Sequence, residues 1–206
     1  FSSGVERIVN VATTTKNSAE VIEQASHYDG MYAAVGIHPS DCYKYSDMDE
    51  VLGFLCELSR HKKVVAIGEI GLDYHYEGFD KELQQQFFER QLELAEKLDM
   101  PVIIHDRDAH GDCFETVLKY PKVRGVFHSF SGSAEMAAEL VKRGWYISFS
   151  GVLTFKNAAR LPEVAKMVPT DKMLIETDCP YLTPVPHRGE TNRSDYIQFT
   201  AEKCAS

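Results

Sequence analysis

The chain has 206 residues, of which 44% are hydrophobic, 26% are charged and 11% are aromatic. This composition excludes collagen-like, low-complexity and disordered acidic proteins, because there is enough apolar material to offset the chain entropy lost on folding. A net charge of −9 argues against nonspecific binding to nucleic acids or membranes, although metal ions or a small basic patch could still hold a polyanion. The length predicts a single domain.

Cysteine usage and apolar runs indicate the compartment. The five cysteines form no C-x-x-C pair, which is typical of reduced thiols and predicts a cytoplasmic protein: Cys42, Cys56, Cys113, Cys179 and Cys204. No apolar run approaches the roughly 18 residues of a membrane span, and no signal peptide is visible. We therefore expect no membrane association, and nothing in the sequence indicates an obligate protein partner.

Short apolar runs alternate with longer amphipathic stretches along the chain. Strands are predicted at residues 7–12, 31–36, 64–68, 101–104, 124–127, 145–149 and 172–175. Helices are predicted near residues 18–26, 47–58, 81–98, 114–119, 134–142 and 161–167. The helix over 81–98 has the clearest one-sided stripe, which includes Phe87, Gln91 and Leu94.

Several of these strands are apolar on both faces, as in a parallel sheet covered by helices. About seven strand–helix units predict an α/β fold, a (β/α)8 TIM-type barrel with about seven of its eight units in this chain. An open α/β sheet is the alternative. No G-x-G-x-x-G follows any predicted strand, so a dinucleotide-binding fold has no support.

Side chains that can bind metal follow four of the predicted strands: Glu69, His105, His128 and Asp178. In a barrel the carboxyl ends of the strands converge on the face that carries catalysis. Two imidazoles and two carboxylates suit a divalent transition metal or a carboxylate-bridged metal pair. Such metals activate water and polarise the bond under attack, so the predicted chemistry is hydrolysis, with Glu69 and Asp178 as catalytic carboxylates.

A second group of residues is suited to substrate. Arg107 follows His105 by two residues, and its guanidinium matches the geometry of a phosphate. Loop residues on the same face are candidates for substrate contact or for support of the metal ligands: His38, Asp73, His75 and Ser131. A basic cluster formed by His187 and Arg188 with Arg193 could also contact phosphate.

Each residue also has a simpler interpretation. The histidines could be structural, and Asp178 could cap a helix before Pro180. Arg107 could pair with a neighbouring aspartate, and the basic cluster could be a solvated loop. The joint pattern at the strand ends favours the functional interpretation, because independent structural histidines have no reason to collect there.

At these residues the sequence resembles the TatD family of metal-dependent deoxyribonucleases. The matching segments, in chain order, are GIHP (36–39), GEIGLDY (68–74), PVIIHDR (101–107), HSFSG (128–132), ETDCPYLTP (176–184) and PHRG (186–189). The resemblance implies a barrel similar to that of the amidohydrolases, with DNA phosphodiesters as substrate and two divalent ions, Mg²⁺, Mn²⁺ or Zn²⁺, as cofactors. It also implies that Glu69 bridges two metals, that His105 and His128 complete one site, and that Asp178 belongs to the other.

The sequence departs from the family pattern at one motif. The family begins with a strand ending in H-x-H, which supplies two ligands to the first metal, and the sequence has no H-x-H. We expect residues 1–206 to be one hydrolase domain that is incomplete at both ends, rather than a defective family member. Two other functions remain open: a metal-dependent amide, ester or lactone hydrolase, and a non-catalytic family member.

Overall fold

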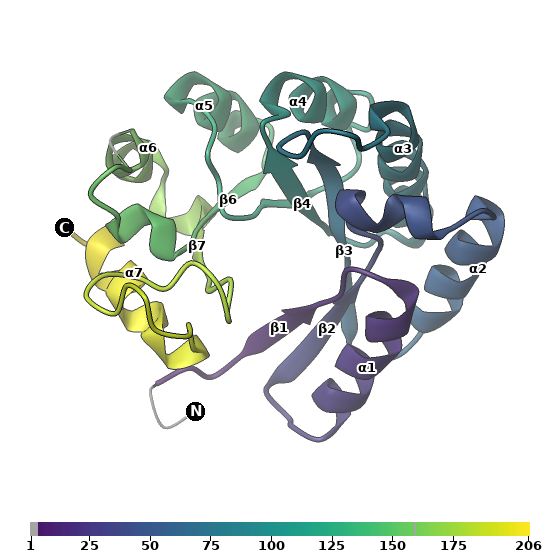
Figure 1. Ribbon diagram of the computed structural model, residues 1–206, viewed down its shortest axis with the longest axis horizontal. Helices are drawn as coiled ribbons and strands as arrows, with labels where there is room; N and C mark the ends of the chain where they lie inside the picture. The colour runs from purple at the N-terminus through teal and green to yellow at the C-terminus, as the bar shows by residue number, and fades with distance from the viewer. Residues whose placement is uncertain (1–3, 159) are drawn as a thin grey trace. The chain divides into compact units, whose positions relative to one another are not determined.

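The computed structural model describes residues 4–158 and 160–206. The chain divides into two compact units, unit 1 (residues 1–125) and unit 2 (residues 126–206). Each unit alternates strands with helices along the chain (Figure 1).

The strands of unit 1 are all parallel and lie in chain order. They are β1 (Ile8–Val11), β2 (Met31–Val35), β3 (Val64–Asp73) and β4 (Val102–Arg107), and each pairs with the next. Parallel neighbours need a crossover connection, and here each crossover contains a helix. The carboxyl ends of these strands therefore open toward the same edge of the sheet.

Helices follow each strand of unit 1. They are α1 (Thr15–Ser26), α2 (Met48–Leu58), α3 (Lys81–Leu98) and α4 (His110–Leu118), with a 3-10 helix η1 (Pro39–Lys44) directly after β2. Figure 1 shows α1 to α4 along the same side of β1 to β4. Side chains of Thr14, Asp47 and Asp80 accept backbone N–H groups and fix where α1, α2 and α3 begin.

Unit 2 repeats the pattern with three parallel strands. They are β5 (Gly125–Phe127), which starts at the last residue of unit 1, β6 (Tyr146–Phe149) and β7 (Met173–Ile175). Its helices are α5 (Ala134–Lys142), α6 (Leu161–Met167) and α7 (Ile197–Cys204), and its 3-10 helices are η2 (Gly151–Thr154), η3 (Thr170–Lys172) and η4 (Ser194–Tyr196). Phe127, Ile147 and Phe149 are fully buried and form part of its core.

All seven predicted strands and all six predicted helices are present. Four boundaries differ by three or more residues. α1 starts at Thr15, three residues before the predicted start, and β4 continues to Arg107, so His105 lies within that strand rather than after it. β3 continues from Gly68 to Asp73, so Glu69 lies within the strand rather than after it. α4 starts at His110, four residues before the predicted start. None of the described helices has the length and apolar character needed to span a membrane.

Candidate metal centres

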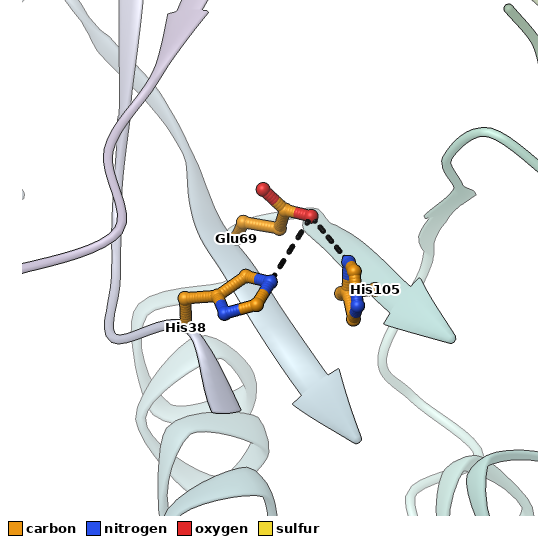
Figure 2. A group of neighbouring side chains, drawn as sticks. All are labelled: His38, Glu69 and His105. Carbon is orange, nitrogen blue, oxygen red and sulfur yellow. Dashed lines mark hydrogen bonds and ion pairs between the residues drawn. The ribbon is translucent and has the colours of Figure 1, made fainter. Parts of the chain in front are cut away.

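Three potential metal ligands meet on unit 1. His38 follows β2, Glu69 lies in β3 and His105 lies in β4, and one ligand atom from each lies within 4.8 Å of the other two. Figure 2 shows both imidazoles turned toward the Glu69 carboxylate. Glu69 Oε1 is 2.7 Å from His105 Nδ1 and 3.8 Å from His38 Nε2.

A β-bulge points Glu69 toward these histidines. The register between β3 and β4 shifts between Gly68 and Ile70, and the Glu69 N–H donates to the carbonyl oxygen of Ala12 instead of joining the β3–β4 ladder. Bulges re-aim a side chain in this way and occur often at functional sites. Gly71 permits the close packing, because its φ is +141° and an added Cβ would lie 2.0 Å from the carbonyl oxygen of His105.

His105 lies between two carboxylates. Its Nδ1 faces Glu69 at 2.7 Å and its Nε2 faces Asp73 Oδ2 at 3.1 Å. Each contact is attractive only when a proton or a cation lies between the two atoms. The Asp73 side fits the arrangement in which a carboxylate holds the far nitrogen of a metal-binding histidine. The Glu69 side is where a divalent ion could take the place of the proton, so these donors fit a metal.

His38 is held as a neutral ring. Burial and the neighbouring His105 lower the pKa of His38 to about 4, against the opposing charge of Glu69. Its Nδ1 accepts the backbone N–H of Ser40 at 3.1 Å, so the ring proton is on Nε2, the nitrogen that faces Glu69. In this tautomer His38 is a hydrogen-bond donor beside the carboxylate and is not a metal ligand. This agrees with the predicted substrate contact better than with metal binding.

Asp73 is only 2% exposed, so it supports His105 rather than reaching a substrate. Burial raises the pKa of its carboxyl, but the hydrogen bond with His105 and the His75 N–H outweigh it and keep that pKa below its usual value. Its own backbone is held by Gln84, whose side-chain amide accepts from the Asp73 N–H and donates to the Asp73 carbonyl.

Unit 2 carries a second group of potential ligands: His128, Glu176 and Asp178, with ligand atoms within 4.8 Å of one another. His128 Nδ1 is 3.0 Å from Glu176 Oε1 and 3.9 Å from Asp178 Oδ1. Burial raises the pKa of Glu176, but the charge and hydrogen bond of His128, with a hydrogen bond from Ser148, hold that pKa below its usual value. Two carboxylates and an imidazole suit a divalent cation.

The structure thus groups the four predicted ligands in pairs, Glu69 with His105 and His128 with Asp178. Glu69 and His128 belong to different units, so a ligand set shared by them stays a prediction. Glu176 was missed as a candidate. The signal was present in the sequence, because Glu176 and Asp178 are two residues apart after a strand, a spacing that places both carboxylates on one side.

The predicted substrate residues of unit 1 lie around the Glu69 group. Arg107, at the end of β4, is exposed and makes no ion pair with any described residue. The ion pair between Arg107 and a neighbouring aspartate, the simpler interpretation of this residue, does not form. Asp106 pairs with His110 and Asp108 pairs with His75 instead. His75 also donates its backbone N–H to Asp73. Arg107 therefore remains available to an anion.

The predicted substrate residues of unit 2 have different surroundings. Ser131 is exposed in the loop after β5. His187 stacks on Tyr196 at 4.3 Å between ring centres and contacts Glu190. Arg188 donates to the carbonyl of Thr183 and lies over the ring of Phe155, in a hollow of about 390 Å³. A phosphate-binding role for these residues stays a prediction.

The sequence model of the family described as TatD related DNase matches residues 1–206. The chain belongs to the TatD family. YabD of Bacillus subtilis, named an uncharacterized metal-dependent hydrolase, is 46% identical over 204 residues, which are 98% of this chain and 79% of YabD. YcfH of Escherichia coli K12, named in the same way, is 39% identical over 198 residues, covering 95% of this chain and 73% of YcfH.

A solved structure agrees with these sequence relationships. The crystal structure of YjjV, a TatD homologue from Escherichia coli K12, matches with a TM-score of 0.91 and 34% identity, over 98% of this chain and 79% of YjjV. The predicted fold class, a TIM-type (β/α) barrel, is confirmed. This TatD chain is a metal-dependent hydrolase, as the sequence predicted.

Proposed function

We propose that this TatD chain hydrolyses DNA phosphodiester bonds with divalent metal ions. The observation that carries the proposal is the Asp73–His105–Glu69 series, together with the exposed Arg107 two residues after His105 on the same strand. This arrangement places donors suited to a metal and a cation suited to a phosphate on two neighbouring strands, β3 and β4. The TatD related DNase family description supports DNA as substrate.

Glu69 and His105 would hold one metal, and His128, Glu176 and Asp178 would contribute to a second. A bound divalent ion would lower the pKa of a water and polarise the phosphorus–oxygen bond under attack. A proton on His105 Nε2, held by Asp73 at 3.1 Å, would leave the lone pair of Nδ1 free to bind a metal beside Glu69.

Two residues would act on the phosphate. The Arg107 guanidinium can donate two parallel hydrogen bonds to phosphate oxygens. His38 holds a proton at Nε2 and, because its pKa is about 4, stays neutral near pH 7 and can donate to an oxygen without adding a charge. A net charge of −9 makes this local arrangement necessary, since the protein as a whole repels a polyanion.

The nature of the metal is part of the proposal. Carboxylate and imidazole together suit Mn²⁺ or Zn²⁺, and Mg²⁺ is also compatible with the carboxylates of Glu69, Glu176 and Asp178. Activity restored to chelator-treated protein by one ion at a time identifies the native metal.

A substrate panel tests the proposal. Purified protein, loaded with Mn²⁺, is incubated with a single-stranded oligonucleotide, a simple carboxylic ester, a lactone and a dipeptide amide. We expect release of nucleotides and little turnover of the others. Hydrolysis of the carboxylic ester, the lactone or the amide, with the DNA left uncleaved, would instead support the amide, ester or lactone hydrolase, and no turnover of any substrate would support a non-catalytic member.

We also propose a cytoplasmic location. The five cysteines, all free thiols, support it, because a reducing compartment keeps such thiols unpaired. Cell fractionation followed by immunodetection tests this location.

A further inference from the structure

Three aromatic rings and a guanidinium form a continuous surface on unit 1, which we call the aromatic shelf: Tyr43, Phe79, Tyr76 and Arg107. The rings of Tyr43 and Phe79 are stacked, with centres 6.2 Å apart and planes 22° apart. Phe79 meets Tyr76 edge to face at 6.1 Å. The guanidinium carbon of Arg107 lies 5.3 Å from the centre of the Tyr76 ring.

The residues of the aromatic shelf lie on the same chain segments as the metal-binding group of unit 1. Tyr43 belongs to η1, which begins directly after His38. Tyr76 and Phe79 lie in the segment that leaves β3 after Asp73. Arg107 ends β4, two residues beyond His105. Both sets of side chains therefore lie at the carboxyl ends of the strands of unit 1.

The shelf exposes apolar rings that a fold normally covers. Tyr43 is 64% exposed and Tyr76 is 54% exposed. Aromatic side chains gain stability from burial, so adjacent exposed rings indicate a surface that a ligand completes. Arg107, beside Tyr76, makes no ion pair within the described part of the chain.

We propose that the aromatic shelf binds the unpaired bases of single-stranded DNA and presents the adjoining phosphate to the metal-binding group. This rests on the proposed function. Bases stack on aromatic faces and on the plane of an arginine, and the stacking tolerates any base sequence. Duplex DNA cannot use the shelf without unstacking, because its base faces already cover one another.

Two lysines lie near the aromatic shelf in addition to Arg107. Lys44 lies 5.8 Å from the centre of the Tyr43 ring and Lys81 lies 3.9 Å from the centre of the Tyr74 ring. Lys44 is paired with Asp41, so Arg107 is the cation best placed to meet a phosphate. Mixed aromatic and cationic surfaces are the usual platforms for single strands.

Equilibrium binding of two probes tests the shelf. The first is a fluorescein-labelled phosphorothioate (dT)8, which resists hydrolysis, and the second is the same backbone with eight abasic sites. Both are titrated by anisotropy with metal-loaded protein. We expect (dT)8 to bind at least tenfold more tightly than the abasic strand, because only (dT)8 has rings to stack.

Variants locate the effect. Tyr76→Ala should weaken (dT)8 binding about tenfold and change abasic binding less than twofold, and Tyr76→Phe should restore most of the loss. Tyr28→Ala is the matched control, because Tyr28 is also 54% exposed but lies just before the amino end of β2, not at the carboxyl ends of the strands. The proposal would be overturned if the two probes bound with equal affinity. It would also be overturned if Tyr28→Ala lost as much affinity for (dT)8 as Tyr76→Ala does.

A second assay separates this proposal from the proposed function. Methyl p-nitrophenyl phosphate is a phosphodiester without a base, and its hydrolysis by the wild-type protein tests the phosphodiesterase chemistry alone. If the protein hydrolyses this ester but binds (dT)8 and the abasic strand equally well, only the proposed role of the aromatic shelf is overturned. If neither the ester nor DNA is hydrolysed, the proposed function fails and the probe titration still decides the shelf.

Discussion

Gln91 holds the backbone of Ile37 with both ends of its side-chain amide. Its Oε1 accepts the Ile37 N–H at 2.7 Å, and its Nε2 donates to the Ile37 carbonyl at 3.1 Å. The amide thus makes the two hydrogen bonds that a neighbouring strand would otherwise make. These bonds hold in place the residue that precedes His38. Gln84, two helical turns earlier on α3, holds Asp73 in the same way. Both glutamines are 1% exposed.

Replacing Gln91 by Leu should destabilise the protein by about 2–5 kcal/mol, because two buried backbone groups lose their partners. Urea unfolding followed by circular dichroism measures the loss. Gln86→Leu is the matched control, since Gln86 lies on the same helix but is exposed. Equal stability of the two variants would show that the Gln91 amide does not hold the backbone.

The fold was largely predictable from the sequence. Apolar runs buried on both faces and amphipathic stretches between them define the strands and helices. Gln91 lies in the apolar stripe of residues 81–98, so its burial was visible, but its partner Ile37 is 54 residues away and no local pattern reveals it. The start of α4 at His110 was not predicted, because His110 and Gly111 add nothing to an apolar periodicity.

The candidate site was predictable in part. Histidines and carboxylates at strand ends predicted Glu69, His105, His128 and Asp178 as ligands, because the parallel strand order brings the residues of each unit to the carboxyl ends of its strands. The role of His38 was not readable, since the tautomer depends on the Ser40 N–H. The extension of β3 was not readable either, because the bulge at Glu69 arises from pairing with another strand.

Asp73→Asn should lower metal affinity about 10–100-fold with the fold retained. The neutral amide no longer stabilises a proton on His105 Nε2, so the ring loses its fixed tautomer. Isothermal titration with Mn²⁺ measures the affinity. Asp108→Asn is the comparison variant, because Asp108 is exposed and contacts His75 instead. An affinity equal to that of wild type would contradict the supporting role.

Stability of the metal-free protein should fall as pH decreases from 6.5 to 4. The pKa of His38 is lowered to about 4 by burial and by His105, so in this range the unfolded chain takes up a proton that the folded chain does not. His38 should thereby lower the free energy of unfolding by on the order of 3 kcal/mol, and most of this loss should have occurred by about pH 4. Urea unfolding at pH 4.5, 5.5 and 7 measures it.

His38→Asn removes this titration and retains an acceptor for the Ser40 N–H, so its stability should depend less on pH in that range. His110 should change the stability with pH in the opposite direction. Its hydrogen bond with Asp106 raises the pKa of His110, and the stability it contributes is present below pH 6.5 and is lost as pH rises through the folded pKa. The same slope in His38→Asn and wild type would assign the pH dependence to other groups.

Arg107→Ala should raise KM for single-stranded DNA about 10–100-fold and leave the bound metal content unchanged, as expected for a charge-assisted hydrogen bond of roughly 1.5–3 kcal/mol. Steady-state kinetics and metal analysis measure both quantities. Arg124→Ala serves as control, because Arg124 is exposed and pairs with Asp99. An unchanged KM would remove Arg107 from the substrate site.

Digestion of a single-stranded oligonucleotide by wild type and Glu69→Gln, side by side at saturating Mn²⁺, tests the central claim most directly. The amide keeps the shape of the side chain but lacks the charge that holds a divalent cation beside His105. We expect wild type to release nucleotides, Glu20→Gln to match it, and Glu69→Gln to lose nearly all activity while its circular dichroism is unchanged. If Glu69→Gln kept more than about a tenth of the wild-type rate, its activation free energy would be raised by less than about 1.4 kcal/mol. That result would contradict a metal centre built on Glu69.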